Sequence, residues 1–345
     1  MEYNDEQKRI ITATENKVVV IAAAASGKTR SLIGRIQYLI DNGNDANSIV
    51  AITYTNAAAI EMRRRLKNCE NVFIGTIHSY CNQILVKYGI NTNDILDKEE
   101  FDELFELIDK NPEICPKVEH LIVDEFQDCS SLHYHFLFDI LKPKNWMVFG
   151  DPRQSIYSFL GGDSSLMLNL AQEEGVKIYQ MRKNYRNGIK ILNFARSYSK
   201  KRGMDYVDDS IPMREIEGNV SFIKNKTLFD ALSSIDFNIP KDWFILARTN
   251  IQVEMIKSIL DKLKVPNIIL RRKDLDNEEL LKIIDSDTVI ISTVHQAKGL
   301  ERNNVIIFGL RENSEEEVNI CYVAITRAKN KLYWIKNIRK NKYTF

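Results

Sequence analysis

The sequence predicts an α/β protein in which two domains each contain a doubly wound parallel sheet. Short apolar runs rich in Val and Ile alternate with segments whose apolar residues recur at helical spacing, which is typical of parallel sheets covered by helices. The alternation restarts after Tyr185-Arg186, so we place the first domain at residues 1–180 and the second at residues 181–345. A chain of 345 residues is long enough for two domains that each bury a core.

The same alternation places the individual elements. In the first domain we expect strands at 17–22, 48–53, 72–75, 120–123, 146–150 and 176–180, and helices at 5–16, 29–41, 57–66, after 75, near 131–141 and near 163–174. In the second domain we expect strands at 218–223, 243–247, 287–292, 304–309 and 331–335, and helices at 187–201, 249–263 and 315–328.

Residues 91–119 break the alternation of the first domain. Asp97 followed by Glu100 has the spacing of a capping box, and an apolar stripe at helical spacing follows. The stripe consists of Phe101, Leu104, Phe105 and Ile108. We therefore expect a small helical insertion within residues 82–119, with a strongly acidic exposed face that is poorly suited to holding DNA.

Composition limits the class of protein and its compartment. The fractions of apolar and charged residues are those of a soluble globular chain, and the net charge of +1 requires any nucleic acid to bind in a local groove. No apolar run approaches the roughly 20 residues of a membrane helix, and the start of the chain is polar and acidic, unlike a secretion signal. The cysteines show no CxxC pairing, so we expect reduced thiols and a cytoplasmic protein without membrane contact. They are Cys69, Cys81, Cys115, Cys129 and Cys321.

Two stretches carry the chemistry. Val18 to Thr29 (VVVIAAAASGKT) predicts a strand, a tight loop and a helix N-terminus, which directs backbone N–H groups and the helix dipole toward a phosphate. Leu121 to Asp128 (LIVDEFQD) predicts a second strand that ends in two carboxylates. A GKT turn or an acidic pair alone is common, but together they favour hydrolysis of a nucleotide bound with Mg²⁺.

Ten segments in fixed order complete the pattern. They are NDEQKRII, AAAASGKTR, AITYTNAAAIEM, GTIHSYC, VDEFQDCS, GDPRQSIYSFLGGD, RKNYRNG, ILARTNIQ, STVHQAKGLE and CYVAITRAK. Each resembles a signature motif of the UvrD/Rep/PcrA-type superfamily 1 DNA helicases, and the resemblance spans nearly the whole chain. It implies two RecA-like P-loop NTPase domains that use ATP and Mg²⁺.

The resemblance implies an ATP site completed from both domains. Catalysis would rest on Lys28 at the phosphates, Glu125 polarising water, Gln154 sensing the γ-phosphate, and Arg186 and Arg327 as arginine fingers. The hydroxyl of Thr29 and the carboxylate of Asp124 would hold Mg²⁺, and Gln7, Arg30 and Tyr185 would contact adenine while Glu301 contacts the ribose. The implied ATP-binding set is Gln7, Ala25, Ser26, Gly27, Lys28, Thr29, Arg30, Tyr185, Arg186, Glu301 and Arg327.

The resemblance also implies that single-stranded DNA, or a tailed duplex, crosses both domains by phosphate contacts and base stacking. The matching positions are Tyr54, Asn56, His78, Tyr157, Phe159, Thr293 and His295. The histidines at 120, 133 and 135 match no motif and are expected to be structural or exposed.

The sequence departs from the family at three single positions and in size. Alanine stands at 23 and 25 where the family commonly has glycine, so either the loop needs only negative φ there or nucleotide affinity is weakened. Leu160 stands in place of an arginine. The family's second insertion has only residues 251–287 available, so it is essentially absent, which argues against processive unwinding by this chain alone.

These observations leave three hypotheses. The first is a UvrD-like ATP-dependent DNA helicase or translocase, stimulated by single-stranded DNA and moving 3′ to 5′. The second is a helicase-like, DNA-sensing ATPase switch that assists a protein partner such as a nuclease or a repair or defence complex, with little unwinding of its own. The third is a degenerate nucleotide binder, suggested only by Ala23, Ala25 and Leu160.

Overall fold

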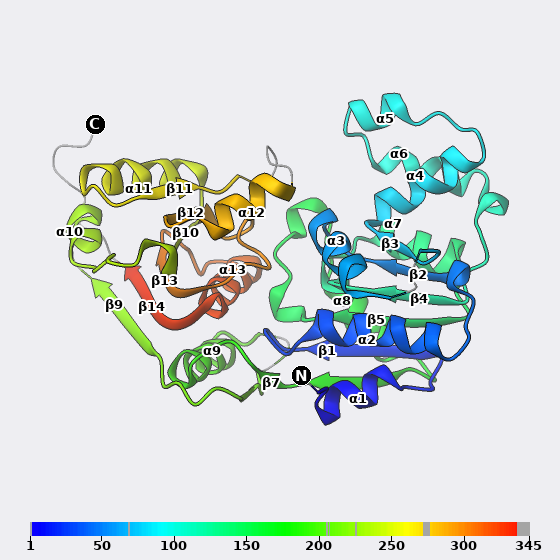
Figure 1. Ribbon diagram of the computed structural model, residues 1–345, viewed down its shortest axis with the longest axis horizontal. Helices are drawn as coiled ribbons and strands as arrows, with labels where there is room; N and C mark the ends of the chain where they lie inside the picture. Colours follow the sequence, from blue (N-terminus) through cyan, green and yellow to red (C-terminus); the bar gives the residue numbers. More distant parts are fainter. Residues whose placement is uncertain are drawn as a thin grey trace. The chain divides into compact units, whose positions relative to one another are not determined.

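The chain divides between Arg182 and Lys183 into two compact units, called unit 1 and unit 2 here (Figure 1). The computed structural model describes residues 2–67, 70–204, 206, 208–224, 226–271 and 277–336. Cys69, one of the cysteines expected to be a reduced thiol, lies outside the described residues.

Unit 1 is built on a sheet of six parallel strands, within the described residues, in the order β3-β2-β4-β5-β1-β6. The strands are β1 (Lys17–Ala22), β2 (Ile49–Ile52), β3 (Phe73–Gly75), β4 (His120–Val123), β5 (Asn145–Gly150) and β6 (Lys177–Met181). The helices are α1 (Asp5–Ile11), α2 (Lys28–Asp41), α3 (Asn56–Arg65), α4 (Ile77–Lys87), α5 (Asn93–Asp97), α6 (Asp102–Asp109), α7 (Ser131–Tyr134), continued by a π-helical stretch at His135–Ile140, and α8 (Ser165–Leu170). Because all strands are parallel, the loops after β1 and β4 emerge at the same edge of the sheet, where doubly wound folds bind ligands.

Unit 2 repeats this architecture with the order β11-β12-β10-β13-β14-β9, again all parallel in the part of the chain that is described. Its strands are β9 (Asn219–Lys224), β10 (Trp243–Ala247), β11 (Asn267–Ile269), β12 (Val289–Thr293), β13 (Arg302–Phe308) and β14 (Ala328–Lys336), and β7 (Lys183–Asn184) pairs with β8 (Ile211–Pro212) apart from the sheet. Its helices are α9 (Ile189–Lys201), α10 (Leu228–Ser233), α11 (Asn250–Lys262), α12 (Asn277–Asp285) and α13 (Glu315–Thr326).

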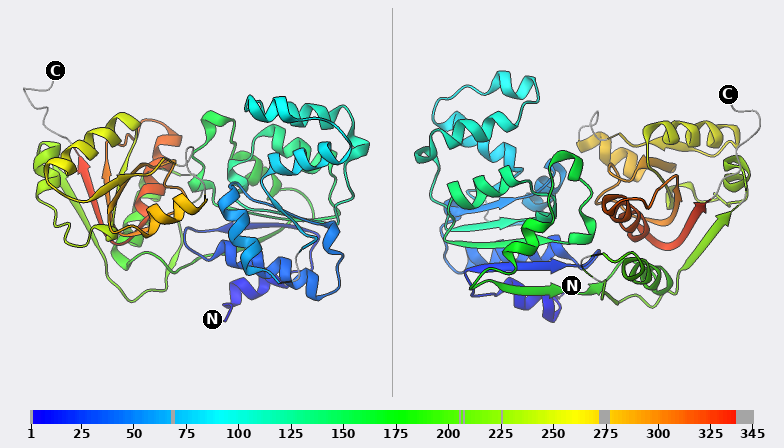
Figure 2. Two further views of the ribbon diagram at one scale, coloured as in Figure 1. Left: turned by 45° about the horizontal axis from the view of Figure 1, so that its top comes forward. Right: turned by 180° about the vertical axis from the view of Figure 1, so that it is seen from behind.

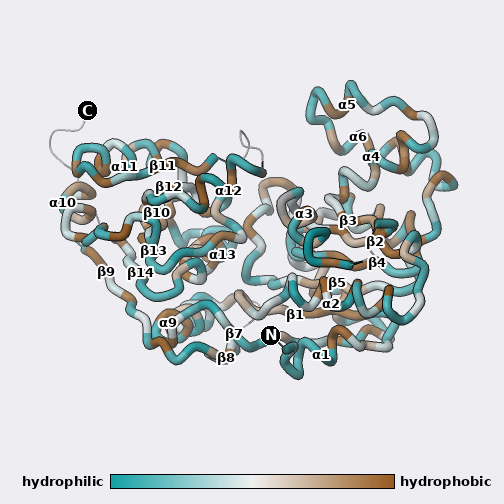
Figure 3. The backbone as a smooth tube through the Cα atoms, viewed as in Figure 1, coloured by the Kyte–Doolittle hydropathy of each residue, from teal (hydrophilic) through white to brown (hydrophobic). Residues whose placement is uncertain are grey.

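The core of unit 1 fixes the helix that follows the first loop. Leu32 and Ile36 of α2 are fully buried against Val18 and Val20 of β1 in one apolar cluster. Apolar residues run along the strands of both sheets (Figure 3). Burying one such side chain contributes roughly 1.5–3 kcal/mol, so the start of α2 is held rigidly over the end of β1.

The predicted fold class, two parallel α/β sheets with a small helical insertion in the first half, is confirmed. The insertion, α5 and α6, projects from unit 1 beyond its sheet (Figure 2). The predicted capping box of Asp97 with Glu100 is wrong: Asp97 ends α5, and α6 begins after Phe101 without a side-chain cap. The reason is Glu99, whose left-handed φ of 57° turns the chain between two short helices.

Other differences concern short or weakly patterned segments. Helix α1 ends at Ile11 instead of residue 16, because Thr12, Thr14 and Asn16 in the run TATEN that follows have low helix propensity. The segments β7, β8, α10, β11 and α12 were not expected. In the described part of the chain, no helix has the length and apolar character needed to cross a membrane.

Candidate functional site

The loop between β1 and α2 contains two residues with left-handed backbone. Ala25 has a φ of 61°, and Gly27, the N-cap of α2, has a φ of 84°. Ala23 does not take a positive φ. Of the two alternatives that the sequence left open, negative φ at both alanines is therefore excluded, because Ala25 takes a positive φ, a conformation that costs an alanine roughly 1–2 kcal/mol.

Replacing Ala25 or Ala23 by glycine should change the free energy of unfolding in opposite directions. We expect Ala25→Gly to raise the free energy of unfolding by about 0.5–1 kcal/mol, because the relieved strain exceeds the roughly 0.4–1 kcal/mol that glycine gives the unfolded chain. Ala23→Gly is the matched control and should lower it by about 0.5–1 kcal/mol. Denaturant unfolding of both variants measures the difference. Equal destabilisation by both would show that Ala25 is not strained.

Lys28 joins the loop to the carboxylates after β4. Its Nζ lies 3.1 Å from Oδ1 of Asp124 and 2.6 Å from Oε1 of Glu125. Thr29 follows Lys28 in the first turn of α2. The structure thus brings together Lys28, Asp124 and Glu125, three of the side chains that the sequence assigned to the phosphates, the metal and the water.

The charges in this cluster depend on one another. Burial by itself would lower the pKa of Lys28, but Asp124 and Glu125 raise it above its ordinary value. Burial raises the pKa of Asp124; Lys28 opposes that shift, and the neighbouring carboxylate of Glu125 reinforces it. The ammonium group therefore stays charged and compensates two adjacent carboxylates, which is the arrangement that a bound cation could replace.

Gln127 connects the carboxylates to the next loop, and sequence reasoning assigned it no role. Its buried amide donates from Nε2 to Oε2 of Glu125 at 2.6 Å and to Oδ2 of Asp128 at 3.3 Å, while its Oε1 accepts from the N–H of Asp151 at 3.1 Å. Asp151 in turn accepts from Nε2 of Gln154 at 2.8 Å. The predicted catalytic base and γ-phosphate sensor are thus linked through two buried side chains. In the sequence, the only sign of this link is that Gln127 belongs to the motif VDEFQD.

The residues predicted to meet adenine in unit 1 flank the start of α2. Gln7 is buried and donates from Nε2 to the carbonyl oxygen of Ser26 at 3.4 Å. Ser26 is buried beneath it, in the loop. The guanidinium carbon of Arg30 lies 4.7 Å from the ring centroid of Tyr3, a neighbour that the sequence did not suggest.

The candidate DNA-binding aromatics of unit 1 lie close to one another. The rings of Tyr54 and Tyr157 stack, with centroids 4.9 Å apart and an interplanar angle of 21°, and Phe159 lies 6.1 Å from Tyr157. Phe159 is 64% exposed and Asn56 is exposed at the start of α3, so both are accessible to a ligand. Tyr54 and Tyr157 are themselves half-buried, so Phe159 is the exposed member of this aromatic group.

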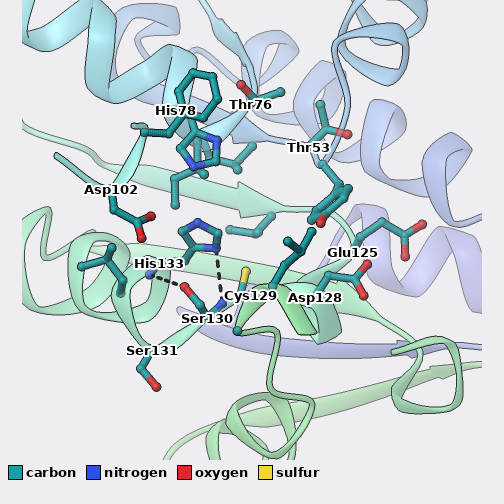
Figure 4. Close-up of a pocket in the computed structure, with 18 of the residues that line it drawn as sticks. Thr53, Thr76, His78, Asp102, Glu125, Asp128, Cys129, Ser130, Ser131 and His133 are labelled. Carbon is teal, nitrogen blue, oxygen red and sulfur yellow. Dashed lines mark hydrogen bonds between the residues drawn. The ribbon is translucent and has the colours of Figure 1, made fainter. Parts of the chain in front are cut away.

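His78 lies deeper, in a cavity of about 980 Å³ beneath the insertion (Figure 4). Its ring contacts Phe101 at 5.1 Å, Phe105 at 5.5 Å and His133 at 5.5 Å. His133, which was expected to be structural or exposed, lines the same cavity and takes part in a reciprocal capping box with Ser130. Burial lowers the pKa of both imidazoles, to about 4 for His133, where His78 adds to the effect and Asp102 opposes it; Asp102 likewise opposes the shift of His78. Both rings are therefore neutral near pH 7.

The cavity is strongly acidic. Among the residues described, eight carboxylates and no Lys or Arg line it. The carboxylates are Glu99, Glu100, Asp102, Glu103, Glu106, Asp124, Glu125 and Asp128. The cavity also includes Tyr54 and Leu160, so it reaches from Asp124 and Glu125 past the candidate DNA residues to the insertion. Such a lining attracts cations and repels phosphates.

In unit 2 the predicted nucleotide residues form one cluster. The guanidinium of Arg186 pairs with the carboxylate of Glu301 and donates from Nη1 to the carbonyl oxygen of Thr326 at 3.2 Å. Arg327 follows Thr326, is buried, and donates from Nε to the carbonyl oxygen of Val323 at 3.2 Å. The sequence-predicted arginines thus converge, although 140 residues separate Arg186 from Thr326.

Charge compensation holds Glu301 ionised. Burial opposes its ionisation, but Arg186 and Lys329, whose Nζ lies 2.9 Å from Oε1, outweigh this and lower its pKa below the usual value. Tyr185, next to Arg186, is 45% exposed and accessible for stacking.

The two candidate DNA residues of unit 2 lie where β12 ends. Thr293 is the last residue of that strand and is buried, and His295 follows in the turn, half-buried. This edge carries the carboxyl ends of the strands, the edge at which parallel sheets bind ligands.

Comparison with known proteins covers both units. The family described as UvrD/REP helicase N-terminal domain matches residues 3–114 and 102–174, and the family described as UvrD-like helicase C-terminal domain matches residues 250–339. The chain is 26% identical to the Putative ATP-dependent DNA helicase R568 of Acanthamoeba polyphaga mimivirus, over 96% of the chain and 53% of the relative. It is 24% identical to the ATP-dependent DNA helicase PcrA of Staphylococcus aureus (strain Mu50), over 91% of the chain and 57% of the relative.

A third relative shows that the chain lacks segments that its relatives contain. The Probable DNA helicase of Mycoplasma pneumoniae is 24% identical over 96% of the chain and 83% of its own length, in an alignment of 451 positions. Since the chain has 345 residues, more than a hundred of those positions have no counterpart in it. The chain spans about half the length of most of the curated relatives it matches. From the two matching families, the order of the motifs and the paired parallel sheets, the chain belongs to the UvrD-like helicase family.

Proposed function

We propose that the chain is an ATP-dependent DNA helicase or translocase that hydrolyses ATP with Mg²⁺, is stimulated by single-stranded DNA and moves 3′ to 5′. The observation that carries the proposal is the contact of Lys28 with Asp124 and Glu125 beneath the left-handed loop. This contact supports the proposal because a lysine suited to phosphates then lies beside one carboxylate that could hold a metal and another that could act as a general base.

The residues of unit 1 suit Mg²⁺, which binds proteins through one or two oxygen ligands and shares the phosphates of its nucleotide. Thr29 and Asp124 would hold it, and it would neutralise charge developing on the transferred phosphoryl group. Lys28 would then turn from the two carboxylates toward the β- and γ-phosphates, and Glu125 would take a proton from the attacking water. Gln154 would report the γ-phosphate to Glu125 through Asp151 and Gln127.

Residues 1–180 and 181–345 would act as two motor domains, with Arg186 and Arg327 of the second completing the site of the first. The exposed Tyr185 would stack on the base and Glu301 would contact the ribose. Thr293, His295 and the aromatics Tyr54, Tyr157 and Phe159 would hold the single strand. We expect translocation from this chain and, because its insertions are small, processive unwinding only with a protein partner such as a nuclease.

The decisive experiment is steady-state ATP hydrolysis with and without single-stranded DNA, followed by strand displacement from duplexes with a 3′ or a 5′ tail. We expect stimulation by the single strand and a preference for the 3′ tail. Absence of stimulation would contradict the proposal. The alternative of a DNA-sensing switch is not favoured, because the relatives of this chain are named as helicases.

Removing negative charge from the cavity should strengthen DNA binding. We expect the triple variant Glu100→Gln, Glu103→Gln and Glu106→Gln to lower the Kd for single-stranded DNA by about 3- to 10-fold at low salt, because these exposed carboxylates repel phosphates within a Debye length.

Fluorescence anisotropy at two salt concentrations measures the effect, which should shrink at high salt. The matched control removes three exposed acids of the same insertion that do not line the cavity: Asp94→Asn, Asp97→Asn and Glu113→Gln. An equal gain from both variants would point to net charge alone.

A further inference from the structure

Tyr3 packs on the face of α2 that carries Arg30, the candidate adenine contact, and Gly34. Its ring packs against the guanidinium of Arg30, 4.7 Å from centroid to Cζ. A Cβ added to Gly34 would stand 2.9 Å from the hydroxyl oxygen of Tyr3. Arg30 and Gly34 are four residues apart and therefore neighbours on one helix face. Tyr3 thus spans one helical turn, with its ring at Arg30 and its hydroxyl over Gly34.

Gly34 is otherwise unexpected where it stands. Glycine in a helix interior costs about 1 kcal/mol relative to alanine, and Gly34 lies buried near the middle of α2. A side chain there would also meet Cδ1 of Ile11 at 2.6 Å. The missing Cβ is what allows Tyr3 and Ile11 to pack directly on the helix.

The segment that carries Tyr3 is anchored on both sides. Asn4 caps α1 in a reciprocal capping box with Gln7, by bonds of 2.9 and 3.1 Å. Gln7 then donates to the carbonyl oxygen of Ser26 in the loop. The segment 3–7 therefore contacts the loop between β1 and α2 through Gln7 and the first turn of α2 through Tyr3.

We infer that Tyr3 is a positioning residue for the base of the nucleotide, acting through Arg30. The inference rests on the proposed function, which puts a base beside Arg30. A planar guanidinium has two faces, so a ring packed on one face fixes the plane that a base meets on the other. An arginine side chain carries about 2 kcal/mol of rotamer entropy, and ordering it before binding removes that cost from the binding step.

A purely structural role for Tyr3 would affect the binding of every ligand at this site to the same extent. Tyr3 should matter for ligands with an aromatic base and not for the phosphates alone. A ring–guanidinium contact is worth about 0.5–1 kcal/mol when exposed and about 2 when desolvated. For these half-buried groups we expect Tyr3→Leu to raise the Kd for a non-hydrolysable ATP analogue by about 3- to 10-fold.

Calorimetry with the ATP analogue and with inorganic tripolyphosphate tests this, without hydrolysis or DNA. The Kd for tripolyphosphate should be unchanged in Tyr3→Leu, and Tyr3→Phe, which keeps the ring, should bind both ligands like the parent chain. Gly34→Ala, which displaces Tyr3 from the helix, should weaken only the ATP analogue. A protein that fails to hydrolyse ATP would overturn the proposed function while leaving this result readable.

A double-mutant cycle identifies the route of the effect. In an Arg30→Ala background, Tyr3→Leu should no longer change the Kd for the ATP analogue, because its effect passes through Arg30. Additive losses would mean that Tyr3 does not act through Arg30. Equal weakening of the analogue and of tripolyphosphate, or no change in either, would likewise overturn the inference.

Discussion

Glu125→Gln is expected to lower kcat for ATP hydrolysis by about 100- to 10,000-fold, because an amide cannot accept the proton of the attacking water. The fold should survive: an amide oxygen at this position can still accept from Nε2 of Gln127, and Lys28 keeps its partner Asp124. The Kd for ATP should stay equal or fall a few-fold, because Lys28 loses one of the two carboxylates that hold it. Single-turnover hydrolysis and binding of an ATP analogue measure the two quantities separately.

The matched control is Glu174→Gln, an exposed carboxylate of the same unit, which should leave both quantities unchanged. If Glu125→Gln retained more than about a tenth of the parent rate, the base would have to be another group, since general bases contribute at least about 100-fold. A large loss of ATP affinity together with kcat would instead indicate damage to the loop.

Arg186→Ala is expected to lower kcat by about 1,000-fold at saturating ATP and DNA, the usual effect of losing an arginine finger. The removed cation would have stabilised charge that develops only in the transition state, so KM for ATP should change much less. Arg186 is a cleaner target than Arg327, which is 2% exposed and bonds to the carbonyl oxygens of Val323 and Leu300. Replacing Arg327 would disturb the packing of unit 2 as well as the chemistry.

The variant leaves little unpaired charge behind. Glu301 loses its ion pair with Arg186 but keeps Lys329 as a partner, and the hydrogen bond to Thr326 is also lost. Arg202→Ala removes a partly exposed arginine paired with Glu312 in the same unit and should hydrolyse ATP normally. A loss below about 10-fold in Arg186→Ala would be inconsistent with direct contact to the transferred phosphoryl group.

The sequence predicted the long elements of this fold well, because their patterns are strong. The runs at Lys17–Ala22 and His120–Val123 are apolar and β-branched, and both strands have the predicted bounds. By contrast β7 and β8 contain two residues each, too few to show any periodicity. The turn at Glu99 could not be predicted, since a glutamate with left-handed φ contradicts its own preference.

The part of the candidate site that could be predicted consists of residues whose side-chain chemistry and motif together indicate a role. Lys28, Asp124 and Glu125 could be assigned from their motifs, and the structure places them in contact. Gln127 and Tyr3 could not, because their roles depend on which atoms lie beside them in space. The backbone of Ala25 was left open for the same reason, since composition does not determine φ.

Gln127 offers a spectroscopic consequence. Its amide is fixed in one orientation, because Nε2 faces the carboxylates of Glu125 and Asp128 while Oε1 faces the N–H of Asp151. The Nε2 group therefore lies between two carboxylates and, because Gln127 is fully buried, its protons are shielded from solvent exchange. Their chemical shifts in a ¹⁵N-labelled sample would report the charge on Glu125 directly, so a single buried side-chain resonance can follow the site through binding and hydrolysis.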